Sequence, residues 1–184
     1  MGDRSDYLLI GEPGEWDDVN VRGSSGPIVL GDKVLMYYCG VGNALGVGRV
    51  GFASWRRDGF VSLHAGEEGG ELLTKPFVPS GPAVHLNVDA SQGEVSVRVC
   101  DNQGKPFEGW SYGNFTDNTI NSAVNAGDRP FDGWYVSRPS QPIRGDHLDA
   151  VVKWENDGFA NRIGKPITLR IQVGNADLYL YWTE

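Results

Sequence analysis

Strict alternation of apolar and polar residues is the feature that most constrains the fold of this chain. Four segments show it: residues 84–89, 94–100, 169–173 and 178–183. In the second of these, Val95, Val97 and Val99 alternate with charged or hydroxyl side chains. Successive side chains of a strand point to opposite faces, so each segment has one apolar face and one polar face. No longer window has the 3.6-residue period of a helix, and the chain is predicted to be all-β, with at most one helical turn at residues 159–163.

Turns rich in glycine separate the predicted strands. Short turns are predicted to close three hairpins, at residues 31–32, 101–104 and 174–177. Two further turns join three short strands within residues 48–77. They are the Arg-Asp-Gly turn at residues 57–59 and the acidic turn at residues 66–70. Glycine suits these places because it accepts the positive φ that tight turns demand.

Strands with one apolar face must bury it against another sheet. We therefore expect a two-sheet antiparallel β-sandwich, jelly-roll-like, over residues 46–184, with His85 and Asn87 on its solvent side. Residues 1–45 are expected to form an N-terminal extension and hairpin. A hairpin alone is only marginally stable in water, so this one must pack on something. Residues 111–141 are predicted to be a long inserted loop.

Charge and cysteine content narrow the range of partners. The chain has 184 residues and a formal net charge of −8. Such a chain repels phosphate backbones, so no nucleic acid is expected, whereas neutral sugars are not excluded. No apolar stretch approaches the roughly 20 residues of a membrane helix, and no signal peptide follows Met1. No membrane partner is therefore expected, and the localisation stays open.

Cys39 and Cys100 are expected to be separate buried thiols, with one long-range disulfide as the alternative.

Several segments resemble a known family. The run GRVGFASWRRDGFVSLHAGEEGGELLTKPF is similar to the start of the C-terminal β-sandwich of bacterial proteins related to glycoside hydrolase families 32, 43 and 68. The likeness continues in EVSVRVCDNQGKPFEGW, PIRGDHLDAVVKW, IGKPITLRIQV and ADLYLYWTE. GEPGEWDDVNVRGSSGPIVLGDKVLMYYCG resembles the last hairpin of the propeller that precedes this sandwich. In that family the propeller carries the catalytic acids, and it is absent here. The resemblance therefore implies a non-catalytic accessory domain, and the insertion at residues 111–141 departs from it.

The predicted ligand site lies in or beside this insertion. Sugars are bound by aromatic rings that stack on their C–H faces and by amides that bond to their hydroxyls. Long loops in compact domains are often functional. The candidate carbohydrate-binding residues are Trp110, Tyr112, Asn114, Trp134 and Tyr135. The alternative is that these aromatic side chains pack over the sandwich.

No catalytic or metal-binding set is predicted. The acidic cluster Glu15, Asp17 and Asp18 lies on one loop, and adjacent loop residues rarely face a shared site for glycoside hydrolysis. The three histidines, His64, His85 and His147, lie on separate segments, whereas a zinc site needs ligands that converge. Neither a cofactor nor a metal is therefore expected.

Three functions agree with these patterns. The first is a non-catalytic module that binds an oligosaccharide through the loop aromatics. The second is a structural protein that forms a homodimer through the N-terminal hairpin and exposed aromatic side chains. The third, and the least favoured, is a small glycoside hydrolase acting alone.

Overall fold

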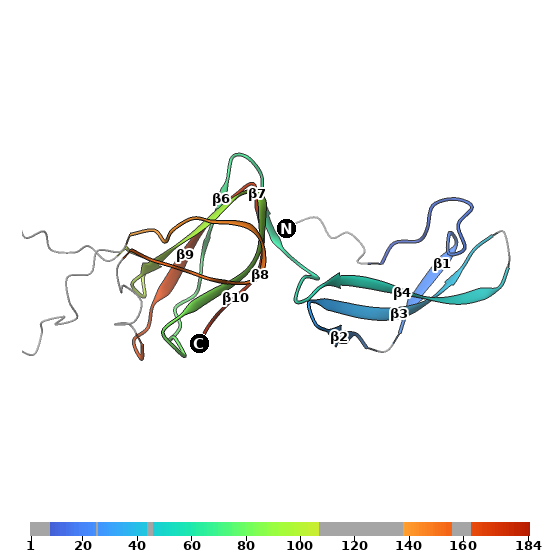
Figure 1. Ribbon diagram of the computed structural model, residues 1–184, viewed down its shortest axis with the longest axis horizontal. Coiled ribbons are helices and arrows are strands. Elements are labelled where there is room, and N and C mark those ends of the chain that lie inside the picture. The colour runs from blue at the N-terminus through green and yellow to red at the C-terminus, as the bar shows by residue number, and fades with distance from the viewer. Residues whose placement is uncertain (1–7, 25, 44–45, 107–137, 156–162) are drawn as a thin grey trace, which may run out of the picture. The chain divides into compact units, whose positions relative to one another are not determined.

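The computed structural model describes residues 8–24, 26–43, 46–106, 138–155 and 163–184 (Figure 1). All the regular elements of this part of the chain are strands, which confirms the all-β prediction. Residues 159–162, where a helical turn was expected, lie outside it. The chain divides into two compact units, Met1–Ser62 and Leu63–Glu184.

The first unit is a four-stranded antiparallel sheet. Its strands are β1 (Asn20–Gly23), β2 (Ile28–Leu30), β3 (Lys33–Val41) and β4 (Gly48–Arg56). Strand β3 pairs with β4 along its whole length, and its other edge pairs with β1 and with β2. The φ of 60° at Gly31 permits the two-residue turn that joins β2 to β3, and this confirms the hairpin predicted there.

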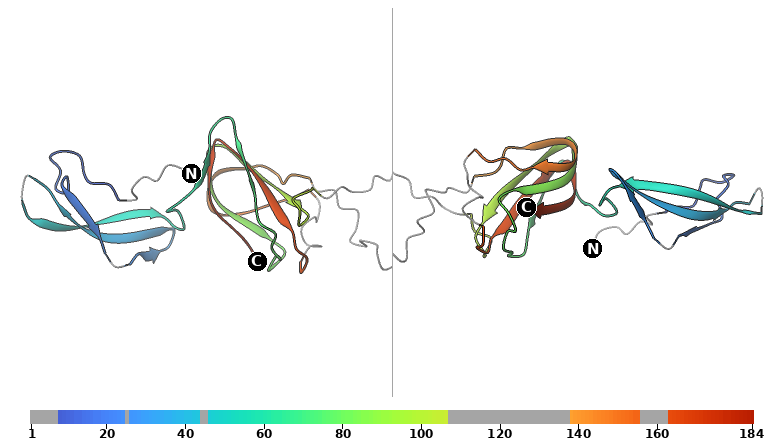
Figure 2. Two further views of the ribbon diagram at one scale, coloured as in Figure 1. Left: turned by 180° about the vertical axis from the view of Figure 1, so that it is seen from behind. Right: turned by 60° about the horizontal axis from the view of Figure 1, so that its bottom comes forward.

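The second unit is a six-stranded antiparallel sheet. Its strands are β5 (Leu63–Ala65), β6 (Gly70–Leu73), β7 (Val84–Cys100), β8 (Ile143–Val151), β9 (Thr168–Gly174) and β10 (Ala176–Thr183). The order is β5-β10-β7-β9-β6, with β8 also on β7. The first half of β7 pairs with β10 and its second half with β9, and the sheet curls around the core (Figure 2). The sandwich-like all-β fold is confirmed, and the six strands of the second unit belong to one curled sheet.

The core of the second unit follows the predicted alternation. Val95, Val97 and Val99 of β7 are fully buried and pack in one cluster with Leu169 and Ile171 of β9. These side chains come from paired strands, so the same face of each strand is apolar. The alternation in β9 and in the second half of β7 therefore identifies the side chains that these segments contribute to the core.

The alternation fails in the second half of β10. The register between β10 and β7 shifts between Leu178 and Leu180, so Tyr179 is an extra residue. Beyond this bulge the faces are exchanged. Tyr181 packs against the core, whereas Leu180 is 41% exposed, and the prediction that Leu180 faces inward is wrong.

Three of the predicted turns join strands that do not pair with each other in the structure. The turn at residues 57–59 is present, with a positive φ at Asp58, but β4 pairs with β3 and β5 pairs with β10. Strand β6 pairs with β9 rather than with β5. Residues 174–177 join β9 to β10, yet β7 lies between these two strands. The boundary between the units also differs from the predicted one after residue 45, because β4 belongs to the first sheet.

The two cysteines are free, so the separate thiols are confirmed. Cys100 is buried as expected, whereas the prediction that Cys39 is buried is wrong. Cys39 lies on β3, where it is exposed. Burial raises the pKa of the Cys100 thiol, and the nearby Arg170 guanidinium acts in the opposite direction.

Candidate functional site

The five predicted carbohydrate-binding residues, Trp110, Tyr112, Asn114, Trp134 and Tyr135, lie outside the residues that the structure describes. The flanks of their segment are described. Pro106 forms a β-bridge with Cys100, at the end of β7. On the other flank, the amide of Ser140 donates to the Val97 carbonyl over 2.7 Å, and the Val97 amide donates to Ser140 Oγ over 3.0 Å. Both flanks therefore attach to the second half of β7.

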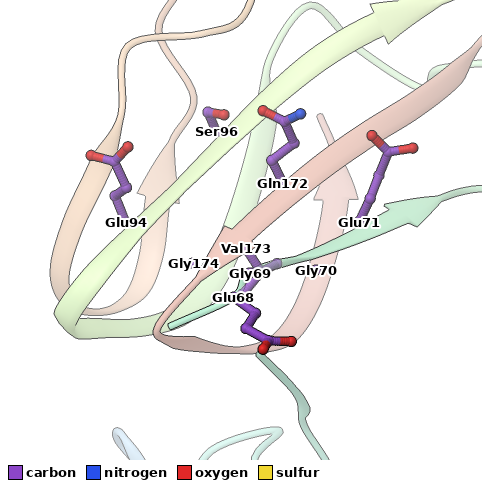
Figure 3. A pocket seen from close by; sticks show the side chains of 9 residues that line it. All are labelled: Glu68, Gly69, Gly70, Glu71, Glu94, Ser96, Gln172, Val173 and Gly174. Atoms are coloured by element: carbon purple, nitrogen blue, oxygen red, sulfur yellow. The ribbon is translucent and has the colours of Figure 1, made fainter. Parts of the chain in front are cut away.

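The same half of β7 borders a shallow hollow of about 480 Å³ on the outer side of the sheet (Figure 3). Its lining residues are Glu68, Gly69, Gly70, Glu71, Glu94, Ser96, Gln172, Val173 and Gly174. Glu71 of β6, Gln172 of β9 and Ser96 of β7 are cross-strand partners and form one polar row. Figure 3 shows these three side chains and Glu94 next to one another along the neighbouring strands.

Local sequence explains the shape of this hollow. Glu94, Ser96 and Gln172 occupy the polar positions of two alternating strands, so the burial of their apolar neighbours turns them outward. Glycine leaves room between them. Gly69 has a φ of 71°, as the turn before β6 requires, and Gly174 ends β9 without a side chain.

Arginines hold two of the carboxylates of the hollow. Arg144 of β8 forms an ion pair and a hydrogen bond with Glu94. Arg170 of β9 lies 3.6 Å from Glu71 Oε1 through Nη1, and its Nη2 donates to the Gly104 carbonyl over 2.9 Å. Together with the Gln172 amide and the Ser96 hydroxyl, these groups give the hollow both hydrogen-bond donors and acceptors.

A second polar constellation surrounds His85, on the outer face of the first half of β7. Its Nδ1 lies 2.6 Å from Asp149 Oδ1, and its Nε2 lies 3.4 Å from Glu184 Oε1. The imidazole stacks on Trp182 with ring centroids 5.0 Å apart. Each ring nitrogen therefore has a carboxylate within reach, and the ring lies between these groups and Trp182.

The prediction that this face of β7 is wet is wrong. His85 is 6% exposed and Asn87 is 1% exposed. The neighbouring strand covers His85, because Trp182 of β10 is its cross-strand partner and the two rings stack.

The acidic cluster near the start of the first unit serves the fold. Tyr38 donates a 2.7 Å hydrogen bond to the buried Asp17, and Trp16 stacks on Tyr38 with ring centroids 5.4 Å apart. Burial, and then the bond to Asp17, raises the pKa of Tyr38 to about 12. Asp18 accepts from the amides of Gly14 and Asn43, which lowers its pKa. The carboxylates of Asp17 and Asp18 are thus engaged by groups of their own unit.

The three histidines do not meet. His64 Nδ1 lies 3.2 Å from Asp177 Oδ1, and His147 Nε2 lies 2.7 Å from the Arg144 carbonyl oxygen. In the described part of the chain, no group of three or more His, Cys, Asp and Glu residues could hold a metal ion. Those residues also contain no helix long and apolar enough to cross a membrane.

The sequence did not predict the hollow, because the order of strands in a sheet cannot be inferred from short segments of sequence. The alternating segments of β7 and β9 do identify Glu94, Ser96 and Gln172 as outward residues. Only the pairing of β6, β9 and β7 brings them together with Glu71.

Comparison of the chain with protein-family models, with curated proteins and with solved structures finds no match. The likeness to the accessory sandwich of glycoside hydrolase families therefore stays a prediction from the sequence.

Proposed function

We propose that this protein is a non-catalytic β-sandwich module, of the glycosidase accessory type, that binds a neutral oligosaccharide. The observation that carries the proposal is the polar hollow on the second unit, where Glu71, Gln172 and Ser96 form one cross-strand row. Carboxylate, amide and hydroxyl groups match the alternating donors and acceptors of sugar hydroxyls.

The acidic character of the site supports a neutral rather than an anionic sugar. Three glutamates line the hollow, Glu68, Glu71 and Glu94, and they would repel uronates and phosphates. The described lining contains no aromatic ring on which a sugar could stack. Binding by the hollow alone is therefore expected to be weak, with a Kd of about 1 mM.

The proposal also includes the aromatic residues that the sequence analysis predicts to bind carbohydrate, Trp110, Tyr112, Trp134 and Tyr135. The flanks of their segment attach to β7 at Val97 and Cys100, and Ser96 of the hollow precedes Val97 directly. Trp110 and Trp134 would supply the stacking surface that the described lining lacks.

Titration with a panel of neutral oligosaccharides tests the proposal, with tryptophan fluorescence and calorimetry as readouts. Gln172→Ala is expected to weaken binding about tenfold, because it removes an amide that both donates and accepts. Gln103→Ala, on the exposed turn after β7, is the matched control and should leave the Kd unchanged. Trp110→Ala and Trp134→Ala measure the contribution of the loop. If every sugar leaves the protein unchanged at millimolar concentration, the proposal is wrong.

A further inference from the structure

One face of the first sheet has an exposed apolar centre. Directly opposed residues of antiparallel strands share a face, so the register places Ile28, Tyr37, Val50 and Phe52 on the same side. Their exposed fractions are 50%, 53%, 76% and 67%, respectively. Isolated exposed apolar residues are ordinary, but a contiguous group on one sheet face marks an interaction surface.

The rim of this face is basic. Arg22 is the cross-strand partner of Cys39, and Lys33 is the partner of Arg56, which puts all three cations on the side of Phe52. Among the described residues that the register assigns to this face, there is no Asp or Glu. We call this surface the basic-rimmed face.

The second unit carries a surface of opposite charge. On the outer side of the first half of β7 and of its neighbours β8 and β10, Asp89, Asp146 and Asp177 lie in one cross-strand row. Asp146 is exposed and the other two are half-buried, whereas His85 and Asn87 beside them on β7 are buried. Val151 and Leu180 on the same side are 47% and 41% exposed.

Two further carboxylates border this surface, because Asp149 and Glu184 flank the outward His85 ring. Alternation along β8 also places Arg144, which pairs with Glu94, on this side, and the register adds His64, the cross-strand partner of Asp177. Carboxylates outnumber these basic groups among the described residues of this side. We call it the acid-rimmed face.

We propose that the basic-rimmed face of one copy of this chain docks on the acid-rimmed face of a second copy. The contact would cover the exposed centre around Phe52 and would pair opposite charges around its edge. Charge complementarity of this kind fixes the partner and accelerates association. Docking of two basic-rimmed faces on each other would oppose like charges instead. This contact uses neither the hollow nor the loop, and it is independent of the carbohydrate proposal.

Sedimentation velocity of the full chain, from low to high micromolar concentration, tests this inference. The expected result is reversible self-association that weakens as salt screens the charged rims. Phe52→Ser should weaken it at least about tenfold, because a central aromatic side chain is lost. Lys33→Glu should do the same through charge reversal. Lys75→Glu makes the same charge change on the second unit away from the acid-rimmed face, and its Kd should stay within about twofold of the parent value.

A double variant with one charge reversed on each face distinguishes this contact from any other self-association. Lys33→Glu combined with Asp146→Lys should recover most of the affinity that Lys33→Glu loses, provided that circular dichroism shows an unchanged fold. A strict monomer at every concentration, an association that ignores Phe52→Ser and Lys33→Glu, or a failed recovery by the double variant would each overturn the inference. So would a monomer that binds vesicles of phosphatidylcholine and phosphatidylserine through Phe52, since the basic-rimmed face would then belong to a lipid surface.

Discussion

Tyr38 is the side chain whose ionisation the fold changes most clearly. Its hydroxyl donates to Asp17, and its pKa is raised from 10.0 to about 12, mainly by burial. A raised pKa means that the fold favours the neutral phenol. This contribution to stability is complete below pH 10, the ordinary pKa of tyrosine, and it is lost as the pH rises through about 12.

An absorbance titration of tyrosinate therefore should contain a late step near pH 12. Tyr38→Phe is expected to remove this step, whereas Tyr37→Phe, at the exposed neighbour, should keep it. A late step that survives in the Tyr38 variant would show that another tyrosine is responsible.

His85 stabilises the outer face of β7. It stacks on Trp182 and contacts Asp149, and its own ring is almost fully buried. His85→Ala is expected to lower the free energy of unfolding by about 2–3 kcal/mol, through lost packing and a lost charge-assisted hydrogen bond. His64→Ala, which breaks the exposed pair with Asp177, should change it by less than about 0.5 kcal/mol. Urea denaturation measures both values, and equal effects would contradict the structural role of His85.

At the level of the elements, β7 depends on a glycine where its two halves meet. A Cβ atom at Gly93 would lie 1.9 Å from the Gly174 carbonyl oxygen and 2.7 Å from that of Asn175. Gly93→Ala is therefore expected to push the end of β9 away from β7 and to cost about 1–3 kcal/mol. At Gly66 a Cβ would meet nothing within 4 Å, so Gly66→Ala serves as the control. Chemical denaturation that gives the same stability for both variants would rule out this close approach.

The bulge in β10 gives a second prediction at this level. Tyr181 packs against the core and its ring centroid lies 6.2 Å from that of Phe77, whereas Leu180 is 41% exposed. Tyr181→Ser is expected to cost about 2 kcal/mol or more, and Leu180→Ser less than about 1 kcal/mol. Simple alternation predicts the opposite order. Thermal denaturation of the two variants therefore tests the bulge itself.

At the scale of the whole molecule, buried apolar side chains are unequally distributed between the two units. The core cluster belongs to the second unit, whereas Val34 and Met36 are the buried large apolar residues among the described part of the first. Local opening costs more free energy where more apolar surface is buried. Amides of β7 and β9 should therefore exchange hydrogen most slowly, and those of β1 and β2 much faster. Hydrogen exchange followed by mass spectrometry that finds equal protection in both sheets would contradict this.

The positions of the main strands, and the faces that they bury, could largely be predicted from local sequence. Burial of Val95, Val97, Leu169 and Ile171 follows directly from a two-residue period, because alternate side chains of any strand point to opposite faces. The turn after β2 was equally local, since Gly31 supplies the positive φ that the turn needs. These features require no information about the rest of the chain.

Which strands pair with one another could be determined only from the tertiary structure. The Arg-Asp-Gly turn after β4 joins strands that belong to different sheets, and residues 174–177 join strands separated by β7. The burial of His85, the bulge at Tyr179 and the meeting of Glu71 with Gln172 all depend on which strands lie side by side. Strand pairing depends on the fit of side chains from distant parts of the chain, and no short window of residues contains that fit.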